Sequence, residues 1–153
     1  MKLVHLTRVY RFCAGHRLHR PDRSDEWNLH AFGKCSYPGG HGHNYTLEVT
    51  VRGEPDPATG LVLPGRTLDE AVAAEVFERI DHRSLNEVLS RDFGPTPTTE
   101  VLILELWRAL EPRIPTPAKL HRLRIRETAK NTFECLGGSP GQTPDERIRG
   151  KTL

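Results

Sequence analysis

The chain has 153 residues, with 22 basic and 20 acidic side chains and a formal net charge of +2. This length suits one ordinary domain, and the mixed charges form no basic stripe, which argues against nucleic acid as the ligand. No apolar run approaches the roughly 18 residues of a membrane span. Three cysteines and an N-terminus unlike a signal peptide predict a reduced, cytoplasmic protein. We expect one domain over residues 1–137 and a flexible C-terminal tail over residues 138–153.

The first third of the sequence predicts two strands separated by a polar loop. Even positions between Val4 and His16 are mostly apolar, which is the period-two pattern of a strand with one covered face. Residues 19–40 are rich in charge and predict a loop. Apolar and polar side chains then alternate from His43 to Val51, which predicts a second strand.

The remainder predicts two helices followed by two strands. A capping-box pattern, Thr67-Leu-Asp-Glu70, begins a helix that runs to about Ile80. Thr98 or Thr99 can cap a second helix that stops before Pro112. Residues 120–128 and 132–136 predict the last two strands. The order ββααββ predicts an α+β fold, a four-stranded antiparallel sheet with two helices on one face.

Three histidines predict a metal site. His41 and His43 are separated by one residue, so on a strand both rings project from the same face, toward the core. His16 ends the apolar face of the first strand, and antiparallel pairing would bring that end beside the start of the second strand. Three imidazoles leave a tetrahedral Zn²⁺ with one open position, which is the arrangement of a catalytic site.

Cys35 lies six residues before His41 in a loop with three glycines, and its neighbour Lys34 is cationic. A thiol near a metal dication and an ammonium would have its thiolate form favoured, as a proton-abstracting base requires. Spacing alone equally allows Cys35 to be a fourth metal ligand in a closed structural site. Cys13 and Cys135 are expected to be buried as small apolar side chains.

Two further positions carry acidic groups of interest. Asp81 directly precedes His82 after the first predicted helix, and a carboxylate beside an imidazole often serves proton transfer. Adjacent residues rarely face one another, so an alternative is that His82 only favours the helix C-terminus. Glu127 shares the parity of Leu123 and Ile125, which points its carboxylate toward the covered face, where it needs a partner such as an aminopyrimidine edge or an arginine.

Together these residues resemble the 6-pyruvoyl-tetrahydropterin synthase family over about residues 4–136. The central match is Phe32-Gly-Lys-Cys35 followed, after five residues, by His41-Gly-His-Asn-Tyr45. Five further segments match in order: His16-Arg-Leu18, Asp56-Pro-Ala-Thr-Gly-Leu-Val62, Asp81-His82-x-x-Leu85-Asn86, Thr98-Thr-Glu100 and Glu127-Thr128. Six ordered motifs are specific together, although no single one would be.

The resemblance implies a tunnelling fold (T-fold) assembled as trimers, with two trimers stacked as a homohexamer and active sites at subunit interfaces. It implies Zn²⁺ on His16, His41 and His43. Mg²⁺ is a further candidate ion, which would bind the triphosphate. Asp81 and His82 would reach the zinc and Cys35 from a neighbouring chain. The pterin would contact Thr98, Thr99, Glu100 and Glu127.

The reaction implied by the resemblance converts 7,8-dihydroneopterin triphosphate to 6-pyruvoyl-tetrahydropterin, a step of tetrahydrobiopterin biosynthesis, with release of triphosphate. Cys35 would remove a carbon-bound proton, and His82 oriented by Asp81 would relay protons. One alternative is a 6-carboxy-tetrahydropterin synthase of queuosine biosynthesis, but the five-residue gap between Cys35 and His41 favours the pyruvoyl-forming enzymes. Another alternative is a pterin- or metal-binding homologue without turnover.

Overall fold

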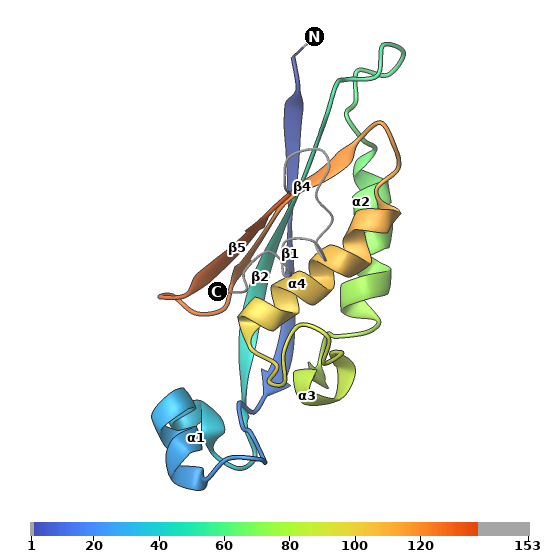
Figure 1. Cartoon of the computed structure of the whole chain (residues 1–153). Helices are drawn as coiled ribbons and strands as arrows, with labels where there is room; N and C mark the ends of the chain where they lie inside the picture. Colours follow the sequence, from blue (N-terminus) through green and yellow to red (C-terminus); the bar gives the residue numbers. More distant parts are fainter. Residues whose placement is uncertain (1, 138–153) are drawn as a thin grey trace.

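The computed structural model describes residues 2–137 (Figure 1). The expected flexible tail, residues 138–153, lies outside the described residues. In Figure 1 the strands form one long twisted sheet, the longer helices α2 and α4 lie on one side of it, and a small helical segment around α1 extends past one end of the sheet. Within residues 2–137 no helix is long and apolar enough to cross a membrane.

The sheet has five strands. They are β1 (Val4–His16), β2 (His41–Gly53), β3 (Arg83–Ser84), β4 (Lys119–Arg126) and β5 (Thr132–Leu136), in the spatial order β3-β1-β2-β4-β5. The neighbours β1–β2, β2–β4 and β4–β5 are antiparallel, as expected. The prediction of four antiparallel strands is wrong in one respect, because the two-residue β3 adds a parallel pairing at the end of β1. A strand this short has no detectable period in the sequence.

The core forms where the inward faces of β1, β2 and β4 meet the helices. Val49 and Leu47 of β2 and Leu123 of β4 are completely buried, and Phe12 stacks on Tyr45 with ring centroids 4.9 Å apart. The antiparallel register pairs His16 with His41 and Ala14 with His43. Because side chains alternate across a strand, this register places all three imidazoles on the core side, at one end of the sheet.

Two helices cover the inner face, as predicted (Figure 1). Helix α4 (Thr99–Leu110) begins where expected, because the Thr98 side chain accepts a hydrogen bond from the Val101 N–H at 3.3 Å. Helix α2 (Gly65–Val72) continues into a π-helical turn (Ala73–Phe77) that brings the chain to the buried Ile80. Helix α4 ends at Leu110, and a 3₁₀ turn (Glu111–Arg113) that contains Pro112 follows it.

The capping box predicted for α2 does not form. The helix begins two residues before Thr67, with Pro64 at the N-cap position and no side-chain capping bond. The fixed φ of proline organises the helix start, and the Thr67 N–H donates to the Pro64 carbonyl at 2.9 Å. The helical segment ends at Phe77, three residues before the predicted end at about Ile80, and its last turn after Val72 is π-helical.

The segment predicted as a loop over residues 19–40 is partly helical. It holds α1 (Asp25–Phe32) and a 3₁₀ turn (Gly33–Ser36), and Ser24 caps α1 by accepting from the Trp27 N–H at 3.1 Å. Helix α1 buries only Asn28, so it has no apolar stripe from which the sequence could predict it. A further short helix, α3 (Leu85–Val88), follows β3.

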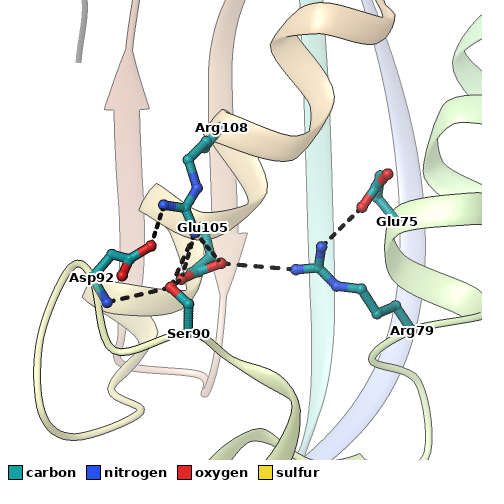
Figure 2. Close-up of polar contacts among 6 residues, drawn as sticks. All are labelled: Glu75, Arg79, Ser90, Asp92, Glu105 and Arg108. Carbon is teal, nitrogen blue, oxygen red and sulfur yellow. Dashed lines mark hydrogen bonds and ion pairs between the residues drawn. The ribbon is translucent and has the colours of Figure 1, made fainter. Parts of the chain in front are cut away.

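A network of charged side chains fastens the loop before α4 to that helix (Figure 2). Glu105 is only 3% exposed, and its carboxylate accepts hydrogen bonds from Ser90 Oγ and from Arg108, the latter at 3.2 Å. Arg108 also bonds the Asp92 carboxylate at 2.6 Å. Arg79 links Glu105 to Glu75 at 3.9 Å and 3.0 Å. The network holds residues 90–92, from which the chain runs on toward Pro97.

Candidate metal centre and active site

The side chains of His16, His41 and His43 converge, and together they are called the imidazole cluster below. His41 Nε2 lies 3.1 Å from His16 Nε2 and 2.9 Å from His43 Nε2. Imidazole nitrogens that share a tetrahedral Zn²⁺ at about 2.0–2.1 Å lie about 3.3 Å apart. The predicted convergence is therefore present, with three ring nitrogens directed at one point.

Hydrogen bonding alone does not satisfy this cluster. His16 Nδ1 lies 2.8 Å from the Pro97 carbonyl, which only accepts, so in the neutral ring the proton is on Nδ1 and Nε2 holds a lone pair. His41 Nε2 carries at most one proton and faces two nitrogens. Only one of the two short contacts can therefore be an ordinary hydrogen bond in neutral rings. A cation shared by three lone pairs removes this conflict, so these residues fit a metal ion.

Burial keeps two of these rings in the form that binds metal. His16 is 3% exposed, and burial lowers its pKa more than the bond to the Pro97 carbonyl raises it. Burial also lowers the pKa of His43, against the opposing effect of the Glu127 carboxylate 3.7 Å away. Both shifts favour neutral imidazole, and neutral imidazole is the metal ligand.

Glu127 lies beside the cluster, just after β4. Its Oε1 accepts a hydrogen bond from the Thr99 hydroxyl at 2.5 Å, and Asn131 donates to Oε2 at 3.4 Å. Thr99 is 1% exposed and sits in the first turn of α4. The parity argument that pointed Glu127 to the covered face is confirmed. No arginine is bonded to Glu127 among the described contacts, so the carboxylate has neutral donors as partners.

Cys35 sits in the 3₁₀ turn that packs beneath the end of β1. Its carbonyl accepts from the Leu18 N–H at 2.8 Å, and Arg17 Nε donates to the neighbouring Ser36 carbonyl at 2.8 Å. Within residues 2–137, the metal-ligating atoms that lie within 4.8 Å of one another at this site are those of the three histidines only. Cys35 is therefore not part of the imidazole cluster.

Asp81 and His82 pair with each other at the outer edge of β1, apart from the imidazole cluster. His82 Nδ1 lies 3.0 Å from Asp81 Oδ1, and the His82 side chain is 79% exposed. Burial raises the pKa of Asp81, but bonds from Cys13 and His82 outweigh it and the net pKa is lowered. The two adjacent side chains can face one another because His82 adopts a positive φ of 59°. His82 therefore forms a carboxylate–imidazole pair with Asp81, and the alternative in which it only favours the helix C-terminus does not describe its contacts.

The other residues expected to contact a substrate do not all lie together. Thr98 uses its hydroxyl to cap α4, whereas Glu100 is exposed on the first turn and makes no described contact with Glu127. Thr99 and Glu127 are together, as described above. The structure thus assembles part of this set in one chain and leaves Glu100 pointing elsewhere.

Sequence reasoning missed several groups that shape the site. The Pro97 carbonyl orients His16, and a backbone acceptor leaves no mark on the sequence. Asn86 bonds both the N–H and the carbonyl of Arg17, at 2.8 and 2.9 Å, and its place in the Asp81–Asn86 motif was the available signal. Gly40 has a φ of 64°, and a Cβ there would lie 2.5 Å from the His16 carbonyl oxygen.

A hollow of about 570 Å³ opens at this end of the sheet. His16, His41 and His43 line it together with Cys13 and His82. This space is large enough for a small organic ligand.

Comparisons with known proteins identify the family of this chain. The sequence profile of 6-pyruvoyl tetrahydropterin synthase matches residues 5–137. The 6-pyruvoyl tetrahydrobiopterin synthase of Drosophila melanogaster is 43% identical over 136 residues, covering 88% of this chain and 80% of that protein. The human protein of the same name is 37% identical over 132 residues, covering 86% and 90%.

A solved structure agrees. The 6-pyruvoyl tetrahydropterin synthase of Caenorhabditis elegans superposes with a TM-score of 0.81 at 35% identity, covering 90% of this chain and 98% of that one. The profile extends over most of the residues described above, including every residue of the imidazole cluster. The chain belongs to the 6-pyruvoyl tetrahydropterin synthase family, a family of lyases.

Proposed function

We propose that this protein is a zinc-dependent lyase that converts 7,8-dihydroneopterin triphosphate to 6-pyruvoyl-tetrahydropterin and releases triphosphate. The observation that carries the proposal is the convergence of three imidazole nitrogens, with His16 held in the metal-binding tautomer by the Pro97 carbonyl. The names of the relatives above, 6-pyruvoyl tetrahydrobiopterin synthases, support a pterin product.

The imidazole cluster would hold the metal through its three Nε2 atoms. A bound Zn²⁺ supplies Lewis acidity toward substrate oxygens. Because no cysteine or carboxylate joins the three histidines within residues 2–137, a position stays open for substrate. This favours the catalytic interpretation of Cys35 over the closed site in which Cys35 is a fourth ligand.

Each remaining group has a role that its surroundings suit. Cys35, in the turn next to the cluster, would accept the proton of a substrate C–H bond as the C–O bond to triphosphate breaks. Glu127, held by Thr99 and Asn131, would accept two donors from the amino-pyrimidine edge of the pterin. Asp81 fixes the His82 proton on Nδ1, so that His82 Nε2 keeps a lone pair for proton transfer.

We further propose that the site is completed by a second copy of the chain, in trimers that stack as a homohexamer. Two observations support this. The Asp81–His82 pair faces outward instead of toward the imidazole cluster of its own chain. The outer edge of β1 pairs with β3 only at Ala14 and Gly15, which leaves the edge before Ala14 open to a neighbouring sheet among the described residues.

The test is metal content together with product identity. Purified full-length protein should bind zinc and convert 7,8-dihydroneopterin triphosphate to a product with the mass of 6-pyruvoyl-tetrahydropterin. Cys35→Ala should keep the zinc and lose the product. Equal substrate consumption by both proteins would exclude a thiol base, and loss of zinc from the variant would favour the closed site. A 6-carboxy product would instead assign the queuosine-type reaction.

A further inference from the structure

A second set of metal-binding side chains, Cys13, Asp81 and His82, lies at the outer edge of β1 and is called the edge cluster below. One thiol, one carboxylate oxygen and one ring nitrogen lie within 4.8 Å of one another. The expectation that Cys13 is buried as a small apolar side chain is wrong, because Cys13 is only partly buried and borders the hollow with His82. The edge cluster is separate from the imidazole cluster, since Cys13 and His16 are about 10 Å apart along the strand.

The backbone builds this arrangement. The Cys13 N–H donates to Asp81 Oδ1 at 2.8 Å, and the His82 N–H donates to the Cys13 carbonyl at 2.7 Å. His82 is the only non-glycine residue with positive φ among residues 2–137. Such a conformation is strained for a residue with a side chain and persists only where the surroundings hold it. Here the two bonds to Cys13 hold it, and the result is an imidazole turned back beside Asp81.

The donor set indicates the class of ligand. Thiolate and imidazole favour zinc and similar transition metals over Mg²⁺ or Ca²⁺, which take oxygen ligands. His82 is exposed, so water can fill the remaining positions around an ion. We propose that Cys13, Asp81 and His82 form a second site for a thiophilic divalent cation such as Zn²⁺, weaker than the imidazole cluster, and that filling it inhibits the enzyme.

The expected inhibition follows from the position of the His82 ring proton after a cation binds, and it rests on the proposed function. In the metal-free pair, the His82 proton lies on Nδ1 toward Asp81 and Nε2 has a free lone pair. Binding of a cation to Cys13 Sγ, the Asp81 carboxylate and His82 Nδ1 releases the thiol proton and leaves the ring proton on Nε2. His82 then has no lone pair with which to accept a proton. Zinc above one equivalent should therefore slow turnover.

The binding experiment uses full-length protein stripped of metal and titrated with Co²⁺. We expect a first equivalent without a sulfur signal and a second equivalent that adds a thiolate-to-cobalt charge-transfer band in the near ultraviolet. Cys13→Ser should bind one equivalent and show no such band. Cys35→Ser is the matched control, because it removes the other nearby thiol and should keep both equivalents and the band.

Two outcomes would overturn the proposal. One is saturation of the wild-type protein at a single equivalent. The other is a band that survives Cys13→Ser and disappears in Cys35→Ser, which would assign the sulfur to the first site. Circular dichroism checks that each variant is folded, and Cys13→Ala, which packs as a small side chain in the same space, repeats the test if the serine variant unfolds.

The activity arm separates this proposal from the proposed function. The turnover of each protein at one equivalent of zinc is its own baseline, because Cys13 bonds Asp81 and its substitution can change the basal rate. Excess zinc should inhibit the wild-type protein, and the variant should need at least about tenfold more zinc for the same inhibition. Equal inhibition of both proteins would contradict the inhibitory role. Absence of turnover at one equivalent would contradict the proposed function and leave the binding result standing.

Discussion

The imidazole cluster and the Asp81–His82 pair are both built on the end of β1, but they differ in how completely one chain supplies them. His16, His41 and His43 are fixed by strand register and by the Pro97 carbonyl, and His16 is 3% exposed. His82 projects into solvent with 79% of its side chain exposed. The first group is a set of three converging imidazoles supplied by one chain, whereas the second is an exposed pair that we propose acts on the site of a neighbouring chain.

This difference has a physical reason. A metal ion requires several nitrogens held at fixed separations, and paired strands with a covering loop provide that rigidity. The proposed role of His82 in a neighbouring chain requires it to stay accessible, and its orientation comes from its own backbone conformation and from Asp81. Substitutions in the two groups should therefore have separable effects on metal binding, turnover and stability.

His82→Asn is expected to separate turnover from metal binding most strongly. Asparagine tolerates positive φ, so the backbone at this position is kept while the base is lost. We expect kcat/KM to fall by about 10²- to 10⁴-fold, the usual contribution of a positioned acid or base. Zinc bound to the imidazole cluster should be unchanged in the same preparation, measured at one equivalent. A parallel loss of that zinc would contradict the separation of the two groups.

The charged network behind the imidazole cluster should be the next most sensitive region. Glu105→Gln removes the charge that Arg108 and Ser90 share, at a buried position (Figure 2). We expect the free energy of unfolding to fall by about 1–3 kcal/mol, as for other unsatisfied buried groups. Urea denaturation measures it.

The matched control for that network is Glu111→Gln, an exposed position just after α4, which should change stability by less than about 0.5 kcal/mol. Because the network holds the loop that leads to Pro97, zinc affinity should also weaken in Glu105→Gln and stay the same in Glu111→Gln. Equal stability of the two variants would remove the network from this account.

Substitutions at two neighbouring glycines distinguish backbone strain from a steric clash near the imidazole cluster. Gly40→Ala and Gly39→Ala both place alanine at positive φ, 64° and 88°, but only at position 40 does the new Cβ meet an atom, the His16 carbonyl oxygen at 2.5 Å. We expect each to cost about 1 kcal/mol of stability through strain. Only Gly40→Ala should also lower zinc affinity. A similar loss of zinc in both variants would show that strain alone disturbs the site.

The smallest effect is expected at the Glu127 side of the site. Thr99→Val keeps the shape of the side chain and removes the hydroxyl that donates to Glu127 at 2.5 Å. We expect KM for the pterin substrate to rise by about fivefold, which corresponds to the roughly 1 kcal/mol of one hydrogen bond. Thr99→Ser, which restores the hydroxyl, should recover the wild-type KM. An unchanged KM in the valine variant would assign Thr99 a packing role only.

The sequence predicted the elements in which apolar and polar side chains recur with a regular period. Alternation in β1 and β2 was sufficient to place His16 opposite His41, and the parity of β4 placed Glu127 on the covered face, where the structure shows it 3.7 Å from His43. The start of α4 followed from Thr98, whose hydroxyl caps it. Where a residue's role depends on which face of a strand it occupies, the sequence was enough.

Features set by backbone conformation could not be predicted. The two-residue strand β3, the positive φ of His82 and the Pro97 carbonyl have no side-chain pattern. Helix α1 carries a capping serine but lacks an apolar face, so composition favoured a loop. The grouping of Cys13 with Asp81 depends on a contact between segments 68 residues apart in the sequence, which alternation along one strand does not reveal.

The most direct test of the central claim is zinc K-edge X-ray absorption on Cys13→Ser protein loaded with one equivalent of zinc, so that only the imidazole cluster is filled. The account predicts three imidazole nitrogens at about 2.0–2.1 Å and one further light ligand in the open position. A sulfur scatterer at about 2.3 Å would contradict it, because Cys35 would then close the site as a ligand and could not act as the base.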